Sequence, residues 1–110
     1  MVDDRIERIE SAVRTAEDIP EERKAEVLDL LAQLRSRISG LSETHQADAD
    51  SIARLVEAST HEATRGSKEP GVLQTALAGL KHSAQGFEAS HPEMVESVNQ
   101  FATVLANMGL

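Results

Sequence analysis

The sequence predicts an all-α protein: an antiparallel helical bundle built from two duplicated helical hairpins plus a short N-terminal helix. Apolar residues recur every three or four positions along most of the chain, which indicates amphipathic helices. The only aromatic residues are Phe87 and Phe101. The core must therefore consist mainly of Leu, Val, Ile, Ala and Met, which suits helix-on-helix packing better than a β-sandwich.

An internal repeat indicates the duplication. The segment Gly40–His45 (GLSETH) returns as Gly86–His91 (GFEASH), 46 residues later. The copies also match before and after this segment, where LAQLR is paired with LAGLK and DSI with ESV. We therefore expect one helix–turn–helix unit written twice, at about 27–62 and 73–108, within a single domain that spans residues 1–110.

Composition excludes several classes of function. The net charge is −8, no segment is basic, and Trp and Tyr are absent, so we expect no nucleic-acid partner and no anionic membrane surface. Without Cys, disulfides and Cys-based zinc sites are impossible. No apolar run approaches the ~18 residues of a membrane span, and the acidic N-terminus lacks the apolar core of a signal peptide. We expect a cytoplasmic protein without a cofactor.

The first helix is expected over residues 3–17. Its apolar residues are spaced four, three, four and three positions apart, and they form one stripe: Val2, Ile6, Ile9, Val13 and Ala16. Pro20 should separate this helix from a second one over 20–42, because proline fits a first helical turn. The stripe of the second helix keeps the same spacing: Lys24, Val27, Leu31, Leu34, Ile38 and Leu41.

Gly40 and Gly86 lie inside helical patterns, one turn before the end of each. A glycine there costs up to ~1 kcal/mol relative to alanine. Either it lets two backbones approach closely, or it is a tolerated residue that loosens the last turn.

The third helix, at about 45–65, has the weakest pattern. We expect Thr44 to be its N-cap, since a hydroxyl there accepts a bond from a free backbone N–H. Alternatively, the second and third helices form one continuous rod. Asp48, Ser59 and Glu62 occupy stripe positions that hold apolar residues in the second copy. Because buried unpaired carboxylates cost several kcal/mol, this helix either lies at the edge of the bundle or turns another face inward.

Breaker residues at 66–71 indicate a loop, and a fourth helix should follow over 71–89 with Phe87 on its stripe. Ser90 and Glu93 have the spacing of a capping box for a fifth helix over 91–108. Short connections make sequential helices antiparallel. The turns at Thr44 and Ser90 should therefore share one end of the bundle, with the N-terminal helix added against a side or used in assembly.

The C-terminal quarter resembles a family of small bacterial helical proteins of unknown function. The residues that carry the resemblance are Phe87-Glu88-Ala89-Ser90-His91-Pro92, Asn99 and the closing Leu105-Ala106-Asn107-Met108-Gly109-Leu110. Family members end in a similar Phe-Glu-x-Ser-His-Pro … Asn-Met-Gly-Ile tail, and Leu110 stands here where Ile is common. His61–Arg65 is similar to a stretch of longer members. The resemblance implies a helical fold and no chemistry.

Few residues suggest a chemical site. If the two turns share an end, His45 and His91 are candidates to share a metal ion, an anion or a proton; the simpler interpretation is two first-turn residues. Glu88 and His91 have the Glu-x-x-His spacing of di-iron bundles, but the other ligands of such a site are missing. Glu57 and Arg65, each four positions from His61, are expected to form surface pairs with it.

We therefore expect a protein that is not an enzyme: a helical module that binds a protein partner or forms a homo-oligomer. The alternative function is binding of a metal ion or small ligand through His45 and His91.

Overall fold

The computed structural model describes residues 2–17, 19–65 and 69–109, and this part of the chain is helical without strands. Its helices are α1 (Val2–Thr15), α2 (Glu21–Ser42), α3 (Gln46–Ala63), α4 (Pro70–Gln85) and α5 (Pro92–Gly109). The Cα radius of gyration is 12.9 Å, close to the ~13 Å of a compact chain of this length. The all-α prediction is confirmed.

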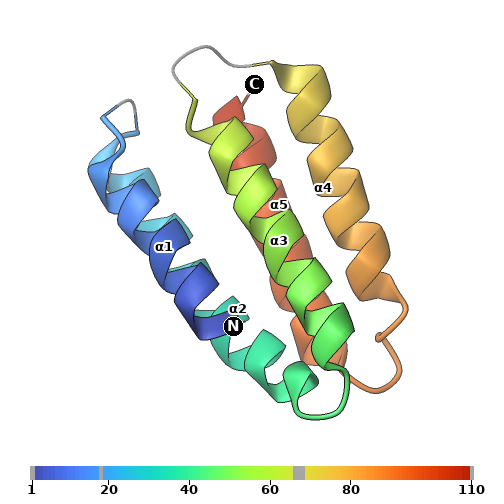
Figure 1. Ribbon diagram of the computed structural model, residues 1–110. Helices are drawn as coiled ribbons and strands as arrows, with labels where there is room; N and C mark the ends of the chain where they lie inside the picture. Colours follow the sequence, from blue (N-terminus) through green and yellow to red (C-terminus); the bar gives the residue numbers. More distant parts are fainter. Residues whose placement is uncertain (1, 18, 66–68, 110) are drawn as a thin grey trace.

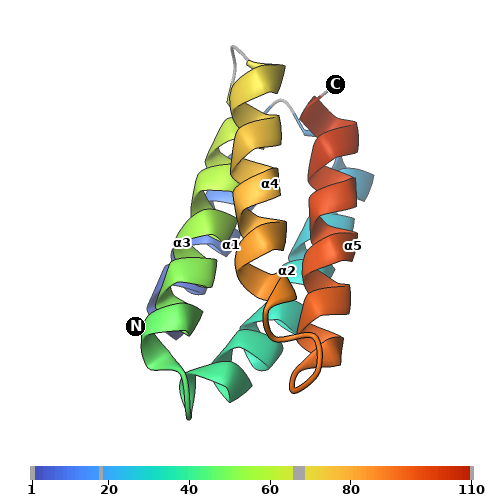
Figure 2. The same ribbon diagram turned by 90° about the vertical axis from the view of Figure 1, so that its right-hand side faces the viewer.

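The helices form two layers (Figures 1 and 2). α1, α3 and α4 lie side by side in one layer, and α2 and α5 pack beneath them. Neighbours in contact are α1 with α2 and α3, α2 with α3 and α5, α4 with α3 and α5, and α3 with α5. α2 and α4 end, and α3 and α5 begin, at one end of the molecule; α1 and α3 end, and α2 and α4 begin, at the other (Figure 1).

The core consists of the predicted stripes. Val2, Ile6, Ile9 and Val13 of α1 are buried, as are the apolar stripe residues of α2 from Val27 to Leu41. On α5 the largest buried side chain is Phe101, which is fully excluded from solvent. Periodicity located these faces correctly because a helix buries the side that its neighbours cover.

The position of α3 differs from the edge position considered above. α3 contacts all of the other described helices, so it lies at the centre of the fold. Its inward face carries mostly small residues: Ala49, Ile52, Ala53, Val56, Ser59, Thr60 and Ala63. Small side chains let several helices approach one helix closely, which explains why an apolar stripe of large residues is missing. The alternative, a rotated inward face, is the correct one.

None of the carboxylates of α3 is both buried and unpaired. Asp48 is exposed, and Glu62 forms an ion pair with Arg65 at 2.8 Å. Ser59, however, is fully buried, and its hydroxyl has no hydrogen-bond partner among the described residues. The neighbouring Thr60 is also buried, but its hydroxyl donates to the Val56 carbonyl oxygen at 2.8 Å.

Replacing Ser59 by alanine should therefore stabilise the protein. The change removes a buried hydroxyl without a partner and introduces a better helix former, so the free energy of unfolding should rise by about 1 kcal/mol. Urea denaturation followed by circular dichroism measures the change. Thr60→Ala is the matched control, because it removes a hydroxyl that is bonded and should lower stability. A less stable Ser59→Ala variant would contradict this expectation.

The prediction that Thr44 caps α3 is wrong, and so is the continuous rod. α2 ends at Ser42, and the backbone N–H groups of Thr44 and His45 both donate to the Leu41 carbonyl oxygen, at 3.2 and 2.9 Å. This tight turn carries the chain past Thr44, and His45, with φ −136° and ψ 62°, becomes the residue before α3. The Thr44 hydroxyl instead lies 2.8 Å from His45 Nδ1.

The prediction of a capping box at Ser90 is also wrong, because α5 starts one residue later than that box requires. α5 begins at Pro92, and the Val95 N–H donates to the His91 carbonyl oxygen at 3.3 Å, which makes His91 the residue before the helix. Proline is favoured at the first helical position and disfavours helical geometry in the residue before it. Pro92 therefore sets the start of α5, and Ser90 lies outside it.

α4 ends earlier than predicted, at Gln85, and Phe87 lies in the turn that follows. The N–H groups of Phe87 and Glu88 donate to carbonyl oxygens three residues back, so the last turn tightens at Gly86. An added Cβ at Gly40 or Gly86 would meet no atom within 4 Å, so neither glycine serves a close backbone approach. Of the predicted loop at 66–71, residues 66–68 lie outside the described part, and α4 begins already at Pro70.

Candidate functional site

His45 and His91 lie at the same end of the molecule, and both pack against one phenylalanine, Phe87. The ring centroids of His45 and Phe87 are 5.3 Å apart, and those of Phe87 and His91 are 6.4 Å apart, both in edge-to-face geometry. His45 is exposed and His91 is half-buried. The two imidazoles therefore pack against a shared aromatic ring, which accounts for both of them without a ligand.

Other ligands for a metal ion do not gather around these histidines. In residues 2–17, 19–65 and 69–109, no three His, Asp or Glu side chains converge on a possible metal position. Glu88, which has the Glu-x-x-His spacing to His91, is exposed in the turn. Metal binding by His45 and His91 stays a prediction.

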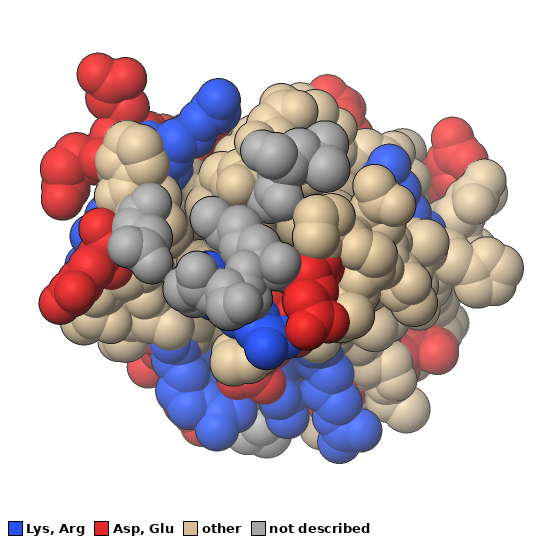
Figure 3. All heavy atoms as spheres, turned by 90° about the horizontal axis from the view of Figure 1, so that it is seen from above, with Lys and Arg blue, Asp and Glu red and all other residues tan. Residues whose placement is uncertain are grey.

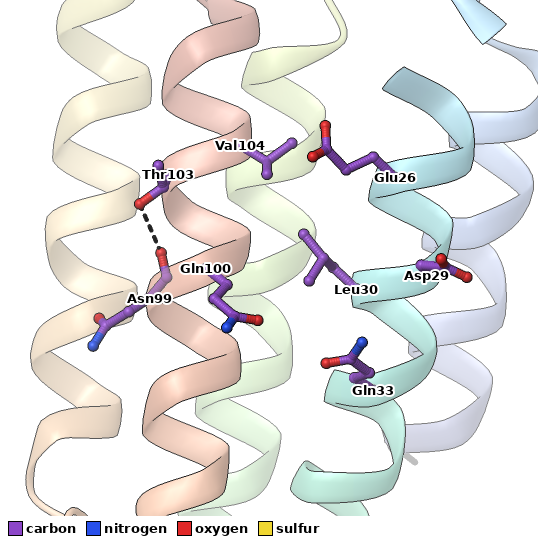
Figure 4. A pocket seen from close by; sticks show the side chains of 8 residues that line it. All are labelled: Glu26, Asp29, Leu30, Gln33, Asn99, Gln100, Thr103 and Val104. Atoms are coloured by element: carbon purple, nitrogen blue, oxygen red, sulfur yellow. Dashed lines mark hydrogen bonds between the residues drawn. The ribbon is translucent and has the colours of Figure 1, made fainter. Parts of the chain in front are cut away.

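A groove lies between α2 and α5 (Figure 4). It has a volume of about 540 Å³. From α2, Leu30 points into the groove, and from α5, Val104 points toward Glu26 across it (Figure 4). Gln33 and Gln100 face each other on the two walls. The remaining lining residues are Asp29, Asn99 and Thr103.

The α5 wall of the groove belongs to a surface without charge. Residues 70–80 of α4 and 97–109 of α5 contain no Asp, Glu, Lys or Arg, although such residues make up 27% of the chain. The two helices pack against each other, and many of these residues are exposed: Gln74, Thr75, Ala78, Asn99, Gln100, Thr103 and Asn107. Solvent-facing helix surfaces usually carry charges, and depletion of charge is typical of the central part of a protein interface.

The opposite side of the molecule, formed by α1 and its neighbours, is rich in ion pairs. Arg35 of α2 binds carboxylates on successive turns of α1, at 3.3 Å from Asp3 and 2.9 Å from Glu7. These hydrogen bonds raise the pKa of Arg35 above its ordinary value, and the bond to Glu7 has the larger effect. On the other side of α1, Arg5 and Arg8 form ion pairs with Glu57 of α3.

Seen from above (Figure 3), Lys and Arg side chains gather along the side that α1 and α3 form. The ion pairs of α1 run to both helices on which it packs, and its apolar stripe is buried against them. Arg5, Arg8 and Arg35 therefore link α1 to both of these helices.

The surface pairs predicted around His61 are wrong. Glu57 pairs with Arg5 and Arg8, Arg65 pairs with Glu62, and no salt bridge within the described residues includes His61. Guanidinium and carboxylate groups form strong, charge-assisted hydrogen bonds with each other. A sequence signal for the Arg35 cluster does exist, because Asp3, Glu7 and Glu10 recur on one face of α1, but nothing in it identifies Arg35 as the partner.

Comparison of the chain with protein-family models, with curated proteins and with solved structures gives no match. The resemblance of the C-terminal quarter to small bacterial helical proteins stays a prediction. Within the described residues, no helix combines the length and the apolar character needed to cross a bilayer.

Proposed function

We propose that the protein is a non-enzymatic helical module that associates with a second copy of itself through the uncharged surface of α4 and α5 and the adjoining α2/α5 groove. The observation that carries the proposal is the loss of charge over residues 70–80 and 97–109 in a chain where about a quarter of residues are charged. We expect the second of the two duplicated hairpins to form this surface, since α4 and α5 are the two helices of that repeat.

Charge argues for a second copy as the occupant. Two copies of a chain with net charge −8 repel each other. They associate most easily where each lacks charge, because like charges brought together across an interface cost several kcal/mol. A basic partner, by contrast, would be attracted to an acidic surface and gain nothing from an uncharged one.

The character of the surface indicates a reversible contact. Among the large hydrophobic residues of the described chain, only Val72 is exposed, at 44%. The groove adds the half-buried Leu30 and Val104. Amides and hydroxyls supply the remaining contacts, so we expect association at tens to hundreds of micromolar rather than an obligate dimer.

Light scattering behind a sizing column, over a concentration series, tests the proposal. The mass should rise from monomer to dimer within this concentration range. Thr103→Glu places a charge on the uncharged surface and should weaken the dimer about tenfold, since a buried like-charge contact is costly. Ser11→Glu, the same change of charge at an exposed hydroxyl of α1, should leave the dimer unchanged.

A mass that stays monomeric at several hundred micromolar would overturn the proposal. Equal weakening by Thr103→Glu and Ser11→Glu would also contradict it, because general repulsion and not the uncharged surface would then govern association.

A further inference from the structure

The side of α2 that borders the groove has an acidic and a basic end. Glu26, Leu30, Gln33 and Arg37 follow one another at intervals of four, three and four residues, so they form one stripe along the helix. Glu26, Leu30 and Gln33 line the groove, and Arg37 lines the adjoining hollow next to the start of α5. The stripe extends over about 16 Å, at 1.5 Å per residue.

This stripe is complementary to itself when it is reversed. We infer that two copies associate around a two-fold axis that passes beside α2, at the level between Leu30 and Gln33. The grooves of the two copies then face each other, and their α2 helices run antiparallel. Glu26 of each copy then faces Arg37 of the other, and each Leu30 faces the other copy's Gln33. The inference rests on the proposed self-association and specifies its register. A two-fold axis requires such reciprocal pairs, in which residue i meets residue j and j meets i.

Both charged residues are available for exchange of partners. Glu26 pairs within its own chain with Arg23 at 2.9 Å, and Arg37 pairs with Glu93 at 2.7 Å. The side chains of these pairs are 43–70% exposed, and ion pairs this exposed contribute little to stability. A second copy that excludes water from the stripe offers each of them a better shielded partner.

One neighbouring charge opposes this register: Glu93 lies 2.7 Å from Arg37, where Glu26 of the second copy would meet it. The other neighbouring charges fit. Asp29, on the rim of the groove, lies in the acidic half of α2 with Glu26. The α5 wall beside them is uncharged, so the reversed helix of a second copy meets no like charge there. In a parallel register Glu26 would face Glu26 and Arg37 would face Arg37, which is why the antiparallel arrangement is favoured.

Charge reversal provides the test. Glu26→Arg alone and Arg37→Glu alone each place like charges opposite one another twice in the dimer, and each should raise the dissociation constant about tenfold. An equimolar mixture of the two variants restores both opposite-charge pairs in the heterodimer. We therefore expect the mixture to dimerise like the wild type, and the Glu26→Arg/Arg37→Glu double variant to do so as well. Sedimentation velocity, with a mass tag on one variant, identifies the heterodimer.

Intrachain effects have their own controls. Glu93→Gln and Arg23→Gln remove the partners of Arg37 and Glu26 within the chain and should not weaken the dimer. Circular dichroism of every variant verifies that the helices are intact. If the wild type dimerises and the mixture of reversed variants does not recover, the register is wrong while the self-association stands. A wild type that stays monomeric overturns both.

Discussion

Phe101→Ala is expected to lower the free energy of unfolding by about 3–5 kcal/mol. Phe101 is the largest of the fully buried side chains and lies on α5 within the single core cluster. Its removal loses the transfer free energy of the ring and leaves a cavity that rigid neighbouring helices fill only in part. Since domains of this size have a total stability of about 5–15 kcal/mol, the variant should be near the limit of folding.

Phe87→Ala is the matched control, because it removes the only other phenylalanine of the chain. Phe87 is half-buried in the turn between α4 and α5, where it contacts the rings of His45 and His91. Its loss should be clearly smaller than that of Phe101. Urea denaturation at low micromolar concentration, where association does not contribute, measures both. A larger loss in Phe87→Ala would mean that the core is not centred as the structure places it.

The second large effect is expected from a change to a larger side chain. Ala53→Leu should destabilise the protein by about 1–3 kcal/mol, because added methylene groups in a filled core force neighbouring side chains and backbone apart. Ala53 is fully buried on α3, the helix that contacts all of the other described helices. Thermal and urea unfolding of the variant measure the loss.

Ala58→Leu, on the exposed side of the same helix, controls for helix propensity and should change stability by less than about 0.5 kcal/mol. If Ala53→Leu were instead neutral or stabilising, α3 would have room on its inward face. It would then lie at the edge of the fold, as the weak stripe had suggested.

These two positions show how far sequence reasoning reaches. Phe101 follows from local information alone, because it recurs at helical spacing with Met94, Val98 and Leu105, all of which are buried. The central place of α3 does not, because its inward face is marked by small residues, which are equally common on exposed helices. The absence of a large apolar stripe therefore left two alternatives open, an edge position and a different inward face, and only the structure shows that the second is correct.

The candidate site, too, was predicted only in part from the sequence. The sequence placed His45 and His91 in corresponding turns, and the structure brings both to one ring at one end of the molecule. The sequence analysis did not predict that Phe87 lies outside α4 and packs against both imidazoles. The groove depends on how α2 and α5 face each other, and the Arg35 cluster depends on α1 crossing to α2. These are contacts between residues far apart in the chain, which no local pattern encodes.

The sequence by itself determined the helical class, the approximate course of every helix and most of the buried stripes, because periodicity and breaker residues act over a few neighbouring positions. The duplication of the hairpin stays a prediction from the sequence. Only the tertiary structure decided which residue precedes α3 and α5, which helix is central and which surface is left without charge. Those outcomes are fixed by packing, since the cost of burying a group and the gain from pairing it depend on the neighbours that folding supplies.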